Sequence, residues 1–349
     1  MHFDAIFLPL RIIRIFYGVW HLMMYSEMSP LEKQHRFRVA LAFALVYVLW
    51  GGTYLAMRVA VEHIPPYVMG ATRFLIAGSS MLAWCALSGR KVRLTRRDML
   101  RLSMVGVLML SVANMGVAWS EEYVSSGLAA LIVAVVPLWV AIMEAWVFRT
   151  RRLSLMGLLG LALGIGGMLV LLWPKISSGT HLGHSELFGA GILVFASMSW
   201  ALGSILSGRW SLSVDIFTSA AWQMTIAGTV NTVIAFATGG FHKAVWTSHA
   251  IWAVVFLVTC GSWIGFTAYI WLLEHVPTPK VATYAYVNPI VAVYFGWLLL
   301  HEKVDAFMLA GTIIVISAVV LVNSSKLKNL KSAEKAGAEK PELSRVTGD

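Results

Sequence analysis

The stretch VALAFALVYVLWGGTYLAM, residues 39–57, contains no Asp, Glu, Lys or Arg. A helix needs about 20 mostly apolar residues to cross the roughly 30 Å hydrocarbon core of a bilayer. An uncharged stretch of this length therefore predicts a transmembrane helix.

Similar stretches continue along the chain on the C-terminal side of this one. Eight further segments lack Asp, Glu, Lys and Arg and are long enough to span, at 102–120, 123–143, 153–174, 187–208, 216–241, 244–273, 281–300 and 306–325. A tenth segment, about 66–88, is interrupted only by Arg73. A helix satisfies its own backbone hydrogen bonds in lipid. The sequence therefore predicts an all-α integral membrane protein with ten transmembrane helices.

The composition agrees with a lipid environment. The 349 residues are 58% hydrophobic and only 13% charged, and the mean hydropathy is +0.75. A soluble domain has roughly 25% charged residues. The net charge of +10 is spread over short loops between apolar segments, which argues against a nucleic-acid partner and for the lipid bilayer as partner.

Signatures of enzymes, cofactor sites and metal sites are not found in the sequence. It has no Gly-rich phosphate loop, no Gly-x-Ser-x-Gly and no His-Glu-x-x-His. Cys85 and Cys260 fit no metal-ligand spacing and no disulfide framework. We therefore expect no catalytic residues, no metal and no cofactor.

The Lys and Arg residues predict the orientation, because short cytoplasmic loops are enriched in them. If the segment before residue 39 is cytoplasmic, the outside loops hold only Arg58, Lys175, Lys243 and Lys303. Both termini are therefore expected in the cytoplasm. The polar segment 326–349 is expected to be a solvated tail.

The N-terminal segment, residues 1–37, is expected to be a cytoplasmic extension. Its first part is apolar and aromatic, but Arg11 and Arg14 interrupt it. Two interpretations stay open: an amphipathic helix on the membrane surface, or a start of translation at Met28.

The chain contains an internal repeat. A shift of 150 residues pairs Trp50 with Trp200 and the run 76–78 with 226–228, and a shift of 152 pairs Pro137 with Pro289. Residues 38–174 and 187–325 are therefore two copies of a five-helix unit. Because five is odd, the second copy must be inverted in the membrane. Inverted repeats are typical of secondary transporters, whose substrate site lies between the repeats near the midplane.

Several short motifs give the chain a family resemblance over about 38–325. They are Leu49-Trp50-Gly51-Gly52-Thr53-Tyr54, Pro65-Pro66 with Arg73-Phe74, Ser126-Gly127-Leu128-Ala129-Ala130 with Val136-Pro137-Leu138, Ser199-Trp200-Ala201, and Tyr284-Ala285-Tyr286-Val287-Asn288-Pro289. With these motifs the chain resembles the EamA family of the drug/metabolite transporter superfamily. One departure is that Glu302, of a Gly-Glu pair frequent in the family, has no counterpart in the first unit.

The resemblance implies a bacterial inner-membrane transporter of small organic solutes with a cavity between helices one, three, four, six, eight and nine. No ATP-binding motif is present, so a proton gradient or exchange is expected to drive export of amino acids, related metabolites or drugs. An uptake permease or a flippase for a lipid-like solute is the alternative within transport. A membrane-embedded enzyme or sensor is the alternative from another class. The sequence does not determine the oligomeric state.

Arg73 is the sharpest candidate for the substrate pathway. It lies seven residues into its helix, roughly 10 Å below the outer end. A charge within a span costs at least about 2.5 kcal/mol, so its side chain should face the bundle or a watery cavity. It either binds a substrate carboxylate or phosphate or fixes the bundle by bonding carbonyls. Its repeat partner is Gln223, also polar.

Two prolines are candidate hinges. Pro289 and Pro137 each remove a helical hydrogen bond and free the carbonyls of Ala285 and Val133. They form either moving joints or static kinks. Asn288 either donates to a substrate or satisfies the carbonyl of Ala285.

The remaining candidates are aromatic, amide and acidic. Aromatic walls suit organic cations and amphipathic metabolites, although Trp and Tyr also form interfacial belts. The aromatic and amide candidates for the pathway are Trp50, Tyr54, Asn114, Trp200, Trp263, Tyr284 and Tyr286. Glu144 carries a coupling proton or pairs with the Arg149–Arg152 cluster, and Glu121 and Glu122 are expected to be loop charges.

Overall fold

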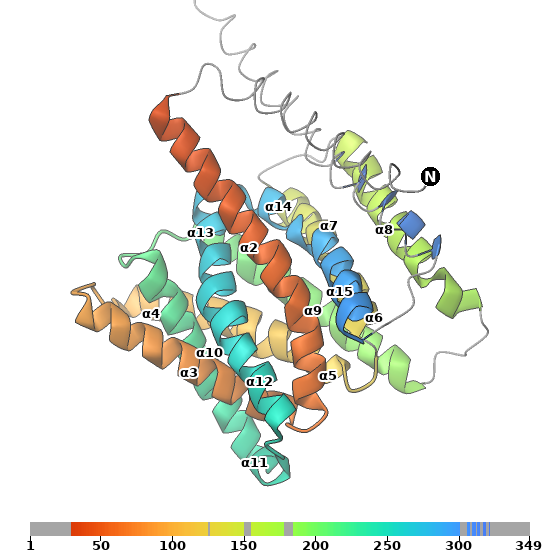
Figure 1. Ribbon diagram of the computed structural model, residues 1–349. Helices are drawn as coiled ribbons and strands as arrows, with labels where there is room; N and C mark the ends of the chain where they lie inside the picture. The colour runs from red at the N-terminus through yellow and green to blue at the C-terminus, as the bar shows by residue number, and fades with distance from the viewer. Residues whose placement is uncertain are drawn as a thin grey trace, which may run out of the picture.

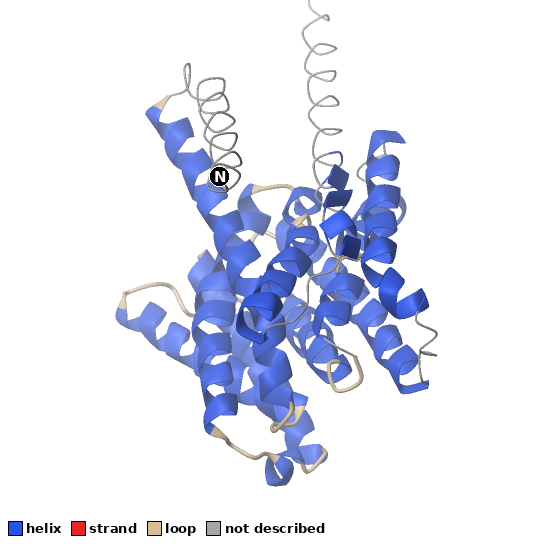
Figure 2. Ribbon diagram, turned by 45° about the vertical axis from the view of Figure 1, so that its right-hand side comes forward, coloured by secondary structure: helices blue, strands red, loops and turns tan. Residues whose placement is uncertain are grey.

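The computed structural model describes residues 29–124, 126–149, 155–177, 184–300 and parts of 306–321. Helices and short loops make up this described part, in which no strand occurs (Figure 2). The predictions for residues 1–28, for Glu302 and for the tail after Leu321 lie outside the described residues.

The helices follow the predicted apolar segments closely. Their bounds are α2 Pro30–Val61, α3 Pro66–Leu87, α4 Arg96–Gly106, η1 Val107–Asn114, α5 Met115–Ser120, α6 Ser126–Val133, α7 Val136–Ile142, η2 Met143–Val147, α8 Leu155–Ser177, α9 His184–Arg209, α10 Ile216–Ala237, α11 Gly240–Lys243, α12 Ser248–Phe256, η3 Leu257–Phe266, α13 Thr267–His275, α14 Thr278–Val281 and α15 Tyr284–Leu300 (Figure 1). The described residues between 306 and 321 are also helical.

Five of the described helices are long and apolar enough to cross a membrane: Pro30–Val61, Pro66–Leu87, Arg96–Ser120, Leu187–Arg209 and Ser248–His275. Val136–Val147 and Leu155–Gly167 are shorter apolar helices. The all-helical membrane architecture predicted from the sequence is thus present in the described part of the chain.

Helix α2 begins earlier than the apolar pattern indicates. Ser29 accepts a hydrogen bond from the Glu32 amide, and the Glu32 carboxylate accepts one from the Ser29 amide. This capping box satisfies two amides that a helix start leaves free. Helix therefore extends from Pro30, across residues that the sequence assigned to the cytoplasmic extension.

Two of the long helices contain π-helical segments at matching places. η1 interrupts the helix made by α4 and α5, and η3 interrupts the helix made by α12 and α13. The two segments begin 150 residues apart. π-Helical turns displace backbone groups from the regular ladder and are frequent at functional sites.

The loops gather at two ends of the bundle. At one end, the Val245 amide donates to the His63 carbonyl, and Arg58 donates to the Glu121 carbonyl. We call this the Arg58 end.

At the other end, which we call the basic end, the loop after α3 meets the loop after α9. Arg90 pairs with Asp215 at 3.3 Å, and Arg101 donates to the Ser211 carbonyl. His35, near the start of α2, lies beside His275 at the end of α13, with ring centroids 6.1 Å apart. The loops at 88–95 and 210–215 and the start of α2 therefore share one end.

Helices α3 and α10 pack closely through two glycines. A Cβ added at Gly78 would lie 2.5 Å from the Thr225 amide nitrogen, and one added at Gly228 would lie 2.6 Å from the Leu75 amide nitrogen. The residues of the second contact are those of the first displaced by 150 positions, with the two helices exchanged. Because glycine has no side chain, each helix can approach the backbone of the other closely at these positions.

Candidate functional site

A partly enclosed cavity lies between α2, α3, η1, α5, α6, α9, η3 and α15. Its volume is about 50 Å³, room for a few water molecules and far below the roughly 300 Å³ of a small-molecule pocket. Its lining combines aromatic side chains with a few polar ones. The residues are Trp50, Thr53, Tyr54, Met57, Arg73, Phe74, Leu110, Ala113, Asn114, Val117, Val133, Ala196, Ser197, Trp200, Gly261, Phe266, Tyr284 and Asn288.

Arg73 supplies the charge of this cavity. It is 3% exposed, and its Nε donates to Ser262 Oγ at 2.9 Å while its Nη1 donates to Asn114 Oδ1 at 3.2 Å. Ser262 belongs to η3 and Asn114 ends η1, so the guanidinium joins both π-helical segments. Among the described residues its hydrogen-bond partners are neutral, and no carboxylate pairs with it. A buried guanidinium without an anion is expensive, and a bound anion would offset that cost.

Two glycines of η3 make room for the large side chains around the cavity. A Cβ at Gly261 would lie 2.8 Å from Arg73 Nη2, and one at Gly265 would lie 2.5 Å from Trp50 Nε1. The Trp50 indole donates to the Gly261 carbonyl at 3.0 Å. The small residues therefore let both Arg73 and Trp50 approach the η3 backbone.

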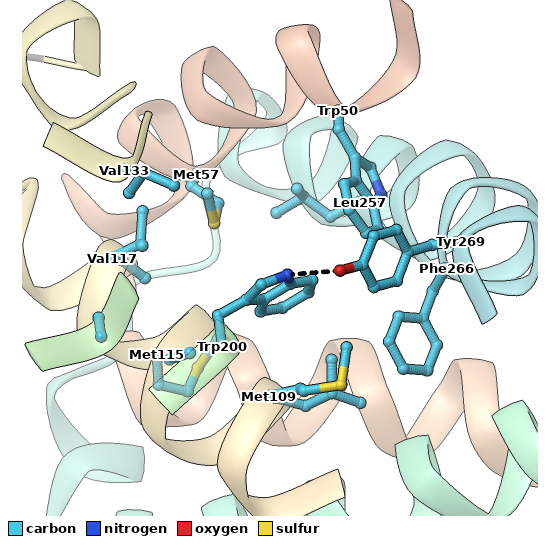
Figure 3. Packing of buried hydrophobic residues seen from close by; sticks show 14 of the residues in the cluster. Trp50, Met57, Met109, Met115, Val117, Val133, Trp200, Leu257, Phe266 and Tyr269 are labelled. Carbon is cyan, nitrogen blue, oxygen red and sulfur yellow. Dashed lines mark hydrogen bonds between the residues drawn. The ribbon is translucent and has the colours of Figure 1, made fainter. Parts of the chain in front are cut away.

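Four aromatic rings form a cluster beside the cavity. Trp50 contacts Trp200, Tyr269 and Tyr284, with ring centroids 5.5, 4.8 and 5.2 Å away. The Trp200 indole donates to the Tyr269 hydroxyl at 3.1 Å, as Figure 3 shows, and that hydroxyl lies 2.7 Å from Ser204 Oγ. Because edge-on aromatic pairs add about 0.5–1.5 kcal/mol each beyond burial, this cluster holds the two halves of the chain together.

Asn288 adds a free acceptor to the cavity wall. It is 2% exposed, and its Oδ1 has no hydrogen-bond partner among the described residues. Its backbone carbonyl lies beside Gly51 of α2. A buried acceptor that lacks a donor carries a desolvation cost of about 1–3 kcal/mol, which a ligand N–H would remove.

The structure brings seven of the ten predicted pathway residues to this cavity: Trp50, Tyr54, Arg73, Asn114, Trp200, Tyr284 and Asn288. It places the other three elsewhere. Trp263 is 38% exposed and donates to the carbonyl of Ala77 in α3. Gln223 donates to Ser219 within its own helix and packs its backbone against Gly106. Tyr286 lies against Gly164 of α8.

Known proteins resemble this chain along most of its length. The EamA-like transporter family matches residues 37–173 and again residues 187–324. The chain belongs to the EamA-like transporter family. The uncharacterized inner membrane transporter YedA of Escherichia coli is 35% identical over 81% of this chain and 90% of its own length.

Two more distant matches cover the same share of this chain. The uncharacterized transporter YoaV of Bacillus subtilis is 22% identical over 81% of this chain and 96% of its own. A crystal structure with 17% identity covers 81% of this chain and 95% of the other with a TM-score of 0.67. At that identity the structural match shows a shared fold alone. The family model matches two consecutive segments of the chain, which we call the two EamA units.

The two candidate hinges of these EamA units differ in backbone structure. Pro137 lies in the first turn of α7, after a break at residues 134–135 that ends α6. Pro289 lies inside α15, which continues through it, and the corresponding break is at residues 282–283 between α14 and α15. The break ends two residues before Pro137 and six residues before Pro289, so the interrupted backbone lies upstream of the proline in both units.

One of the acidic candidates differs from expectation. Glu144 lies in η2 and is partly buried. The interpretation of Glu121 as a loop charge is wrong, because the residue is completely buried at the end of α5. Among the described residues, no group of three His, Cys, Asp or Glu side chains could hold a metal ion.

Several cavity residues were not identified in the sequence. Phe74, Phe266 and Met57 are ordinary apolar residues of a membrane helix, and their direction depends on helix rotation. The π-helical segments η1 and η3, which supply the hydrogen-bond partners of Arg73, have no recognised sequence signature. The close spacing of Gly261 and Gly265 is the one signal that was available for η3.

Proposed function

We propose that this chain is a secondary transporter that moves small organic metabolites with a carboxylate across the membrane by alternating access. The observation that carries the proposal is Arg73: a buried guanidinium in a central cavity, held by neutral partners from both π-helical segments. Its planar fork matches a carboxylate and binds it in a fixed orientation.

The other lining residues of the cavity suggest the rest of the substrate. Asn288 offers an acceptor for an N–H group, and Trp50, Trp200 and Tyr284 offer aromatic faces that suit an ammonium group or an organic body. A carboxylate and an amine on one small molecule describe an amino acid or a related compound.

The size of the cavity supports an alternating mechanism. At about 50 Å³ the cavity is too small for an amino acid in this conformation, so we propose that it widens when a substrate enters. We propose that the Arg58 end and the basic end open in turn around Arg73, with the breaks before Pro137 and Pro289 as joints.

The two EamA units are proposed to be inverted five-helix repeats, residues 38–174 and 187–325. The exchanged contacts between α3 and α10 support this arrangement, because a twofold axis between the helices produces such pairs. The matching positions of η1 and η3 support it as well.

The proposed orientation puts the basic end and both termini in the cytoplasm of a bacterial cell, with the protein in its inner membrane. Lys91, Arg90 and Arg101 gather at that end, as expected for the cytoplasmic side. We propose export, driven by a proton gradient or by exchange.

Transport by reconstituted protein tests the proposal. Proteoliposomes with an imposed proton gradient would be given a panel of radiolabelled amino acids and related carboxylates, and separately preloaded for exchange. At least one carboxylate should move, and its methyl ester should not compete. Arg73→Ala at equal protein content should abolish the movement, while Arg73→Lys should keep part of it. Movement of panel members by Arg73→Ala at the wild-type rate would refute the role of Arg73.

A further inference from the structure

Glu121 is buried in an unusual way for an acidic residue at a helix end. Its exposed fraction is 0%, and neither carboxyl oxygen has a hydrogen-bond partner among the described residues. Arg58, the nearby cation, donates to the backbone carbonyl of Glu121 and not to its carboxyl group. The Arg58 side chain also pairs with Glu62, with Nε and Oε1 3.5 Å apart.

This carboxyl group lies next to the central cavity. The Glu121 amide donates to the carbonyl of Val117, one turn earlier, and Val117 lines the cavity. Arg58 similarly lies one turn beyond Tyr54, another lining residue. Glu121 and Arg58 therefore each lie one helical turn beyond a cavity-lining residue, at the Arg58 end.

The charge state of Glu121 follows from this setting. An ionised carboxylate without partners is far more costly to bury than a neutral carboxyl group. Burial raises the pKa of the Glu121 carboxyl well above its ordinary value, although the Arg58 guanidinium opposes the rise. The charged and titratable groups that face it are Arg58 and Tyr54, both from α2. Burial of this carboxyl group therefore favours its neutral, protonated form.

We propose that Glu121 is the proton-binding site that couples closure of the Arg58 end to proton uptake, an inference that rests on the proposed transport function. In the closed conformation the neutral carboxyl group is buried. When this end opens, water reaches Glu121, the proton leaves, and the carboxylate can pair with Arg58. Closing takes a proton from the outer side, and opening of the basic end exposes the same group through the cavity to the other side.

The sign of the pH effect follows from linkage. The closed state binds the proton more tightly than the open state, so acid favours closure and alkali favours opening. The ratio of open to closed protein can change by up to about tenfold per pH unit between the two pKa values.

Accessibility of a cysteine in the cavity measures this ratio without any substrate. Met57 is buried and lines the cavity, and His63 is exposed at the same end. In a background with Cys85→Ala and Cys260→Ala, Met57→Cys would be labelled with a small maleimide from pH 5 to pH 8 in proteoliposomes. Dividing by the rate for His63→Cys removes the pH dependence of the thiol itself.

The expected result is a ratio that rises with pH. Glu121→Gln, which keeps the neutral shape, should give a flat ratio at the acidic level, and Glu121→Asp should restore a slope. Glu122→Gln, the exposed neighbour, should retain the wild-type slope. A labelling ratio that still rises with pH in Glu121→Gln overturns the proposal. A ratio independent of pH in the wild type does so too, as does one that is independent of pH in Glu144→Gln and not in Glu121→Gln.

The two proposals fail in different ways. If substrate is transported but labelling does not depend on pH, Glu121 is not the proton site, and the proposed transport function still holds. Alternatively, the labelling ratio could depend on pH through Glu121 while no carboxylate of the panel is transported. That result would refute the proposed substrate class but not the proton site.

Discussion

The two EamA units differ at one matched position, Arg73 of α3 and Gln223 of α10. The units share their scaffold, since Gly78 and Gly228 make exchanged contacts with the opposite helix. Yet Arg73 reaches both π-helical segments across the cavity, whereas Gln223 bonds within its own helix. The repeat thus supplies a symmetric frame, and the chemistry is supplied by the residues that break the symmetry.

Exchanging these two residues gives the largest expected effect. Arg73→Gln gives the first unit the residue that the second unit has at this position. The substitution removes hydrogen bonds of a charged group, and such bonds are worth about 1.5–3 kcal/mol. Transport of any carboxylate found in the panel should fall about 10- to 100-fold. Gln223→Ala should change it far less, because Gln223 does not reach the cavity.

The double variant Arg73→Gln with Gln223→Arg should remain as weak as Arg73→Gln alone. Initial rates in proteoliposomes at matched protein content measure all three variants. Rescue by the double variant would mean that the two positions are interchangeable, and the comparison would fail.

Two tryptophans test whether the junction between the units is as important as its packing suggests. Trp200 lies in the aromatic cluster, whereas Trp263 lies outside it and is 38% exposed. Trp200→Ala should lower the free energy of unfolding by about 3–5 kcal/mol. Trp263→Ala should cost less than about 1.5 kcal/mol, mainly its hydrogen bond. Thermal unfolding in detergent should rank them so, and equal losses would contradict the assignment of the cluster as the junction.

The paired glycines sharpen the comparison with a smaller effect. Gly78→Ala and Gly228→Ala each force a methyl group against the backbone of the opposite helix, which should cost about 1–3 kcal/mol. Because the contacts are exchanged copies, the two losses should be similar. Gly166→Ala in α8, where a Cβ meets nothing within 4 Å, should be neutral or stabilising. A large loss at one glycine with none at the other would argue against matched packing, again by thermal unfolding.

The helices were predictable from the sequence because one physical constraint governs them. Lipid excludes charge and requires satisfied backbone groups, so apolar segments such as 39–57 and 187–208 coincide with helix. Prediction was poorer where contact with lipid does not decide the structure. Helix α2 begins at Pro30 because of the Ser29 cap, and η1 and η3 depart from the α-helix.

The site was predictable in part, for the same reason. Arg73 and Asn288 stand out because a polar side chain inside an apolar segment requires an explanation. Trp263 and Tyr286 did not reach the cavity because the rotation of a helix about its axis is set by tertiary packing. Glu121 was misread because it follows a span directly, and the approach of α2 that buries it depends on contacts between distant segments.

Accessibility of two equivalent loops tests the inverted arrangement most directly. Ser88 follows α3 and His242 lies in α11 after α10, and both are exposed. In the background without Cys85 and Cys260, Ser88→Cys and His242→Cys would be treated in intact cells with a membrane-impermeant maleimide. We predict that His242→Cys is labelled and that Ser88→Cys is protected until the membrane is opened. Labelling of both from the same side would contradict the inversion of the two units.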